Sequence, residues 1–229
     1  MTEFRYSHIV GQYHRGHADL KNIRWAIQDI NMDSEKVLTF VDNHDNQRGG
    51  FPVTIYKEAR VYKMATSFHL AYPYGIPRLM SSFDFNGHDQ GPPQDSNQNL
   101  LSPTFNADGT CNNGWVCEHR WYQIYKMIQF RNVVKNTNVE NWWDNGWNKI
   151  AFSRGNRGFV AYATHEEGFD ENLQTGLPAG TYCDLATGGK VGSSCRGLSM
   201  TVGGDGRARV YWPGGHSEGF VAFHVEEKL

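Results

Sequence analysis

The 229-residue sequence lacks any long hydrophobic run. No window approaches the roughly 18 apolar residues that a transmembrane helix requires, so we expect no membrane partner. Residues 1–6 also lack the apolar segment of a secretory signal. Runs of Lys or Arg are absent, and the formal net charge is −2. This charge balance argues against nucleic acid or an anionic membrane surface as the main partner.

Cysteine is absent from the first 110 residues and occurs only as Cys111, Cys117, Cys183 and Cys195. The spacings within the two local pairs, five and eleven intervening residues, suit small disulfide loops. Zinc ligands are the rival interpretation, but they usually stand about two to four residues apart. Because disulfides form in oxidising compartments, we expect a secreted or extracellular protein whose natural start lies upstream of residue 1.

The first part of the chain alternates between strand and helix patterns. Apolar residues make up 39% of the whole sequence and aromatic residues 14%, which predicts a packed globule. Residues 4–6 could form a strand or the end of one, and further strands are expected at 37–41 and 75–82. Helices are expected over 19–30, 54–71 and 118–134, with a long polar excursion at 83–117. This order indicates a parallel α/β sheet or part of a barrel, since a complete barrel needs about eight strands.

The character of the sequence changes near residue 138. Short apolar segments separated by Gly-containing turns replace the helical patterns. Strands are expected at 150–153, 159–163, 198–202, 208–212 and 219–225. These features predict an antiparallel β-sandwich. We therefore divide the chain into domains at 1–136 and 137–229.

The apolar run 37–41 is followed at once by the polar segment DNHDNQR, residues 42–48. Polar residues at the carboxyl end of a barrel strand are where barrel enzymes carry their chemistry. Asp45 could act as a base, a nucleophile or an electrostatic stabiliser, and His44 could hydrogen-bond a polyhydroxylated ligand. A plain surface loop is the alternative.

Structural roles are the favoured interpretation for several other residues. Asp42 is expected to shape the loop, and Glu118 to stand at a helix start. Trp142, Trp143 and Trp147 could form a sugar-binding platform, but their place at the domain junction favours packing in a core.

The segment FVDNHDNQRG closely resembles the fourth conserved motif of animal-type α-amylases, in the α-amylase family of glycoside hydrolases. Other segments resemble the same family in the same order: TEFRY, LAYPYGIPRLMSS, GPPQD, CNNGWVCEHRW, RNVV, RGNRGF and LQTGLPAGTYCD. The resemblance implies that 1–136 holds the last three β/α units of a TIM (β/α)8 barrel and that 137–229 is a C-terminal antiparallel β-sandwich of Greek-key type. It also implies a chloride-dependent α-amylase that cleaves internal α-1,4-glucosidic bonds with retention, of which this chain is the C-terminal part.

The resemblance assigns roles to individual residues. Asp45 matches the third catalytic carboxylate, which stabilises the oxocarbenium-like transition state, and His44 matches a sugar-binding residue beside the scissile bond. Asn43 and Arg78 match two ligands of the activating chloride, which would raise the pKa of a neighbouring acid. The two cysteine pairs match two disulfides of the animal enzymes.

The sequence departs from the family in two respects. After Arg48 it reads GGFPVTIY, where the animal enzymes commonly carry a Gly-rich mobile loop. The motifs of the nucleophilic Asp and the general-acid Glu, which precede TEFRY in the family, do not occur here. Most calcium ligands are missing as well, so we expect no metal site in this chain, although calcium is expected in the complete enzyme.

The expected partners are starch, glycogen and malto-oligosaccharides, and the complete enzyme is expected to be a monomer. A non-catalytic starch-binding or interaction protein that keeps a remnant cleft is the alternative function. A related α-glucosidase is a second alternative.

Overall fold

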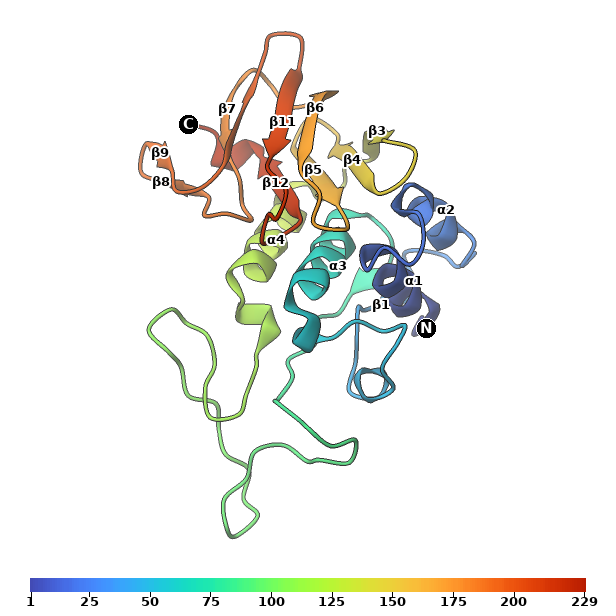
Figure 1. Ribbon diagram of the computed structural model, residues 1–229, viewed down its shortest axis with the longest axis vertical. Coiled ribbons are helices and arrows are strands. Elements are labelled where there is room, and N and C mark those ends of the chain that lie inside the picture. The colour runs from blue at the N-terminus through green and yellow to red at the C-terminus, as the bar shows by residue number, and fades with distance from the viewer.

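The computed structural model describes residues 1–229 as an α/β part followed by a β-rich part (Figure 1). The α/β part contains four α-helices and two short strands: α1 (Arg5–His14), α2 (Ile23–Gln28), β1 (Leu38–Thr39), α3 (Ala59–Ala71), β2 (Ile76–Pro77) and α4 (Tyr122–Val133). Short 3₁₀ turns occupy Leu20–Asn22, Asn46–Arg48, Tyr56–Glu58, Glu118–Arg120 and Val225–Glu227. None of the helices combines the length and apolar character that crossing a bilayer requires.

The parallel pairing expected of a barrel segment is present. β1 pairs in parallel with β2, with Leu38 opposite Ile76, and Thr2 forms a parallel bridge to Leu38 on the other side. Three segments therefore lie side by side in the order Thr2, β1, β2. The predicted helices at 19–30, 54–71 and 118–134 are confirmed as 3₁₀ turns that lead into α2, α3 and α4.

The strand suggested at 4–6 is wrong, because α1 begins at Arg5. The backbone N–H of Arg5 donates to Oε1 of Glu3 at 2.7 Å, which places an acceptor at the helix start. The buried face of α1 includes Ser7, Gly11 and His14 beside Tyr6 and Val10. Because small and polar residues interrupt this face, the sequence shows no continuous apolar stripe there.

The β-rich part is built from antiparallel strands, as predicted. One sheet has the order β12-β5-β4-β3, formed by β3 (Val139–Asp144), β4 (Lys149–Arg154), β5 (Gly158–Ala163) and β12 (Phe220–His224). The remaining pairs are β6 (Phe169–Gln174) with β11 (Arg207–Trp212), β7 (Gly180–Cys183) with β10 (Ser199–Val202), and β8 (Lys190–Val191) with β9 (Ser194–Cys195). The chain turns at 203–206 as expected, but β10 and β11 pair with different partners.

The four-stranded sheet is the central layer of the molecule. Every residue of β5 is buried, and its side chains alternate between two cores. Val160 and Tyr162 join the core that includes residues of α3 and α4, whereas Phe159 and Ala161 join the core beneath β6 and β11. The domain division at 136/137 stays a prediction, since apolar packing continues across that point.

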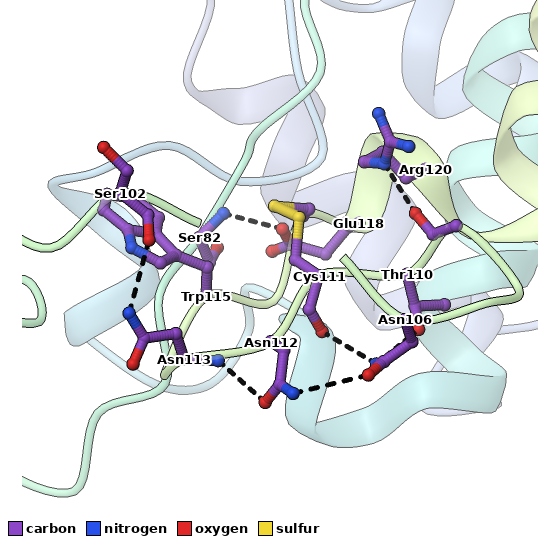
Figure 2. Close-up of a disulfide and its surroundings, with 12 residues drawn as sticks. Ser82, Ser102, Asn106, Thr110, Cys111, Asn112, Asn113, Trp115, Glu118 and Arg120 are labelled. Carbon is purple, nitrogen blue, oxygen red and sulfur yellow. Dashed lines mark hydrogen bonds between the residues drawn. A yellow bond between two sulfur atoms is a disulfide. The ribbon is translucent and has the colours of Figure 1, made fainter. Parts of the chain in front are cut away.

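A long irregular excursion over residues 83–117 extends away from both cores (Figure 1). Cys111 and Cys117 form a disulfide near its end, with a Cα–Cα distance of 5.7 Å (Figure 2). A second disulfide joins Cys183 of β7 to Cys195 of β9. No cysteine is free, so both predicted pairings are confirmed.

Candidate functional site

A cleft of about 580 Å³ lies along the parallel segments and the loops that follow them. Its walls come from the bridge at Thr2, from β1 and the loop that follows it, and from the residues after β2. All four predicted site residues line this cleft: Asn43, His44, Asp45 and Arg78. The adjacent pairing of β1 and β2 therefore brings Arg78 to the loop that carries the other three.

Two asparagines shape the loop after β1. Oδ1 of Asn43 accepts the backbone N–H groups of Asp45 and Asn46, each at 2.9 Å. Oδ1 of Asn46 accepts the N–H of Asn43 at 2.8 Å, and its Nδ2 donates to Ser7 of α1 at 3.0 Å. Such side-chain bonds to nearby backbone groups stabilise a tight turn. The turn leaves the side chains of His44 and Asp45 outside these bonds.

The side chains of His44 and Asp45 are the accessible groups of the loop. They are 82% and 70% exposed, and Nε2 of His44 lies 3.4 Å from Oδ1 of Asp45. Neither side chain hydrogen-bonds any other protein group. A carboxylate and an imidazole in this position can meet the hydroxyl groups or the developing positive charge of a ligand.

The cleft also contains N–H donors that are free to bind an anion. The backbone N–H of Arg78 donates to the carbonyl of Thr39 at 2.8 Å, but its guanidinium forms no ion pair or hydrogen bond with the protein. Nδ2 of Asn43 is also without a protein partner. A free guanidinium and a free amide beside one cleft supply N–H donors that fit the chemistry of a chloride ligand set. No group of three His, Cys, Asp or Glu residues is placed to hold a metal ion.

A buried pair of acids lies beside the cleft. Asp42 accepts a hydrogen bond from Tyr62, and burial together with the nearby charge of Glu118 raises the pKa of Asp42 to about 8. Glu118 accepts the backbone N–H of Ser82 at 2.6 Å (Figure 2), and burial raises its pKa. Asp42 Oδ2 and Glu118 Oε1 have no hydrogen-bond partner. The sequence does not show that these acids are neighbours, because they are 76 positions apart along the chain.

Arg48 is a second residue whose role the sequence did not reveal. Its guanidinium donates to the backbone carbonyls of Gly87, His88 and Gln90 at 2.9–3.2 Å. It also lies 3.8 Å from the ring centroid of Phe85. Arg48 thus joins the loop of the cleft to the start of the 83–117 excursion.

This architecture, with polar groups after neighbouring parallel strands and antiparallel sheets in the second part of the chain, is that of parallel β/α barrel units with an attached all-β domain. Residues 141–226 match the family described as "Alpha amylase, C-terminal all-beta domain". An "Alpha-amylase-related protein" of Drosophila pseudoobscura pseudoobscura is 50% identical over 100% of this chain and 47% of its own length. The protein of that name from Drosophila melanogaster is 49% identical over the same shares.

A solved structure gives the same result. A variant of α-amylase I from Eisenia fetida, in complex with maltohexaose, superposes with a TM-score of 0.87 at 37% identity. The match covers 98% of this chain and 49% of that one. The chain therefore belongs to the α-amylase family, and it spans about half the length of the curated relatives it matches.

Proposed function

We propose that this chain is the C-terminal half of an α-amylase that hydrolyses internal α-1,4-glucosidic bonds of starch and glycogen with retention. The observation that carries the proposal is the gathering of Asn43, His44, Asp45 and Arg78 around one cleft. The relationship to the α-amylase of Eisenia fetida, solved with maltohexaose, supports an α-glucan as the ligand.

In this proposal Asp45 acts as an electrostatic stabiliser. Retaining hydrolysis needs one carboxyl to protonate the leaving oxygen and a second to form a covalent glycosyl-enzyme. Asp45 supplies a third carboxylate, which stabilises positive charge on the sugar ring. Its exposed position and its freedom from ion pairs with Lys or Arg leave the charge available to the ligand. His44, next to it, donates a hydrogen bond to the sugar beside the scissile bond.

Asn43 and Arg78 are the proposed chloride ligands. Both offer N–H groups that no protein acceptor occupies. A chloride bound there would supply negative charge that keeps a nearby acid protonated. We also propose that the complete enzyme binds calcium. The two disulfides support secretion as the protein's destination.

A non-catalytic α-glucan-binding role is the second candidate. The curated relatives bear the name "Alpha-amylase-related protein". In that role the cleft would bind malto-oligosaccharides without cleaving them. A related α-glucosidase would cleave short oligosaccharides in preference to starch.

Two measurements test the proposal. The first is calorimetric binding of maltohexaose to the 229-residue chain, to His44→Ala and to Asp45→Asn, with and without chloride. The second is release of reducing sugar from soluble starch by this chain joined behind the first half of the Drosophila pseudoobscura relative. We expect chloride-stimulated hydrolysis that falls by about 10²-fold or more in Asp45→Asn, because transition-state stabilisers typically contribute that much.

The outcomes separate the candidates. Binding of maltohexaose by the joined protein without hydrolysis would support the non-catalytic role. Hydrolysis of maltohexaose but not of starch would support an α-glucosidase. If His44→Ala does not weaken the binding of maltohexaose, the assignment of the cleft is wrong.

A further inference from the structure

The loop that carries His44 and Asp45 has a single residue that reaches the interior of the protein. Within residues 43–50 only Gln47 is buried, and it is 3% exposed. The backbone N–H of Gln47 donates to the carbonyl of Asn43 at 3.1 Å, which closes the turn around the two exposed side chains. Gln47 is therefore the residue through which the interior can hold this turn.

The interior partner of Gln47 is Ser82. The hydroxyl of Ser82 donates to Oε1 of Gln47 at 3.1 Å, and Ser82 is 0% exposed. Ser82 lies four residues beyond Arg78, so the bond joins the loop after β1 to the segment after β2 across 35 positions of the chain. Loss of such a bond leaves a polar atom without a partner in the interior, which favours the bonded arrangement.

The backbone of Ser82 is held in turn by the end of the 83–117 excursion. Its N–H donates to Oε2 of Glu118 at 2.6 Å (Figure 2). Its carbonyl accepts the N–H of Val116 at 2.9 Å and that of Cys117, a disulfide residue, at 3.4 Å. Because these three bonds use only backbone atoms of Ser82, they leave its hydroxyl free for Gln47. They also remain when the side chain of Ser82 is changed.

We propose that Ser82 is a positioning residue of the cleft, because its hydroxyl holds the loop through Gln47. The loop then places His44 and Asp45 where they meet the ligand. Ser82 does not line the cleft, so it acts only through its partner. The reaction that Asp45 serves rests on the proposed function, whereas the link from Ser82 to the loop rests on the hydrogen bonds alone. Displacement of a reacting group by about 1 Å can cost about 100-fold in rate.

Another buried serine provides the comparison with a purely structural role. Ser67 of α3 is 1% exposed, and its hydroxyl donates to the carbonyl of Met64 at 2.8 Å. This bond joins positions three apart within one helix, so its loss can weaken α3 but does not release the loop of the cleft. Ser67→Ala therefore removes the same atom from a buried site and is the matched control.

The first test is amide hydrogen exchange of the 229-residue chain across residues 45–49. Ser82→Ala should speed this exchange about fivefold relative to the wild type, because one buried hydrogen bond is lost. Ser67→Ala should leave exchange at 45–49 unchanged. Ser82→Thr keeps a hydroxyl and should restore most of the protection. Gln47→Met removes the acceptor and should match Ser82→Ala, and the double variant should exchange no faster than either single variant.

The second test measures kcat and KM for soluble starch in the joined protein described above. Ser82→Ala should lower kcat about tenfold and change KM less than about twofold, because Asp45 acts on the transition state while many other contacts bind the substrate. Ser82→Thr should recover most of kcat. Ser67→Ala should keep both values of the wild type, since a general loss of stability does not separate kcat from KM in this way.

The two tests separate this inference from the proposed function. Unchanged exchange at 45–49 in Ser82→Ala would overturn the inference, whatever the joined protein does. Faster exchange there in Ser82→Ala and Gln47→Met, together with an inactive joined protein, would support the link and contradict the proposed function. Equal acceleration in Ser82→Ala and Ser67→Ala would refute the positioning role, as would an active Ser82→Ala protein with the kcat and KM of the wild type.

Discussion

The hydroxyl of Tyr62 donates a hydrogen bond of 3.0 Å to Oδ1 of Asp42, and both side chains are buried. Tyr62 belongs to α3, whereas Asp42 stands at the start of the loop that carries His44 and Asp45. The hydrogen bond therefore links a helix to the wall of the cleft. The charged neighbour that most affects Asp42 is another acid, Glu118. Burial, together with this like charge, raises the pKa of Asp42 and favours its neutral form.

This arrangement predicts a specific pH dependence of stability. The pKa of Asp42 is raised from 3.8 to about 8 in the folded chain. Below about pH 4 the carboxyl is protonated in both the folded and unfolded states. Its contribution to the free energy of unfolding is therefore at its maximum there. Between about pH 4 and 8 only the folded state keeps the proton, and the free energy of unfolding falls as pH rises, by up to about 1.4 kcal/mol per pH unit.

Asp42→Asn should reduce this loss, because an amide keeps an acceptor for Tyr62 and carries no proton to lose. Urea unfolding at pH 5 and pH 8 measures the effect, and the variant should lose less stability between the two values than the wild type. Asp29→Asn, at an exposed aspartate that follows α2, should leave the difference unchanged. Identical pH slopes in wild type and Asp42→Asn would contradict the prediction.

Arg48→Ala should loosen the start of the excursion without unfolding the protein. The three backbone carbonyls that Arg48 binds lie at 87–90, on an exposed segment. We expect faster amide hydrogen exchange across 84–90 and a loss of only about 1–2 kcal/mol in the free energy of unfolding. Lys36→Ala, which removes an exposed ion pair, is the control and should leave exchange at 84–90 as it is. Unaltered exchange in Arg48→Ala would show that other contacts hold the segment.

Gly158→Ala should destabilise the junction between α4 and β5. A Cβ at Gly158 would lie 2.5 Å from Cγ1 of Val134 and 2.7 Å from Cζ of Phe130, both buried. Overpacking of this kind typically costs about 1–3 kcal/mol. Gly204→Ala is the control, since no atom lies within 4 Å of its added Cβ. Thermal unfolding of the two variants should separate them clearly, and equal midpoints would be inconsistent with the packing described.

Asp184→Ala should cost about 3 kcal/mol or more. The buried carboxylate accepts the N–H of Ala222 in β12 at 2.8 Å, the N–H groups of Ala186 and Thr187, and the Thr187 hydroxyl. Its removal leaves several donors without an acceptor in the interior. Asp170→Ala is the matched control. Asp170 is likewise a hydrogen-bonded aspartate, but its partner is Arg209, at 2.6 Å and 2.7 Å, and the pair lies on the surface. The control should lose about 1 kcal/mol or less in denaturant unfolding, and similar losses in both would refute the argument.

Much of the fold follows from local patterns. Apolar spacing predicts α3 and α4, and short alternating segments predict β4, β5 and β10–β12. The helix α1 could not be predicted, because its buried face contains Ser7, Gly11 and His14. The burial of these residues depends on neighbours from elsewhere in the chain. Pairing partners are equally non-local, so the sequence shows a turn between β10 and β11 but not their separation into different pairs.

The sequence by itself determined the residue types of the cleft, the two disulfide pairs and the family to which the chain belongs. These are properties of contiguous motifs and short spacings. Only the tertiary structure decided that Asp42 lies near Glu118, that Arg48 joins the loop to the excursion, and that Trp147 is exposed while Trp142 is packed. The physical reason is that burial, charge proximity and exposure depend on which distant segments pack against a residue. Two tryptophans five positions apart therefore have different environments, which no local pattern distinguishes.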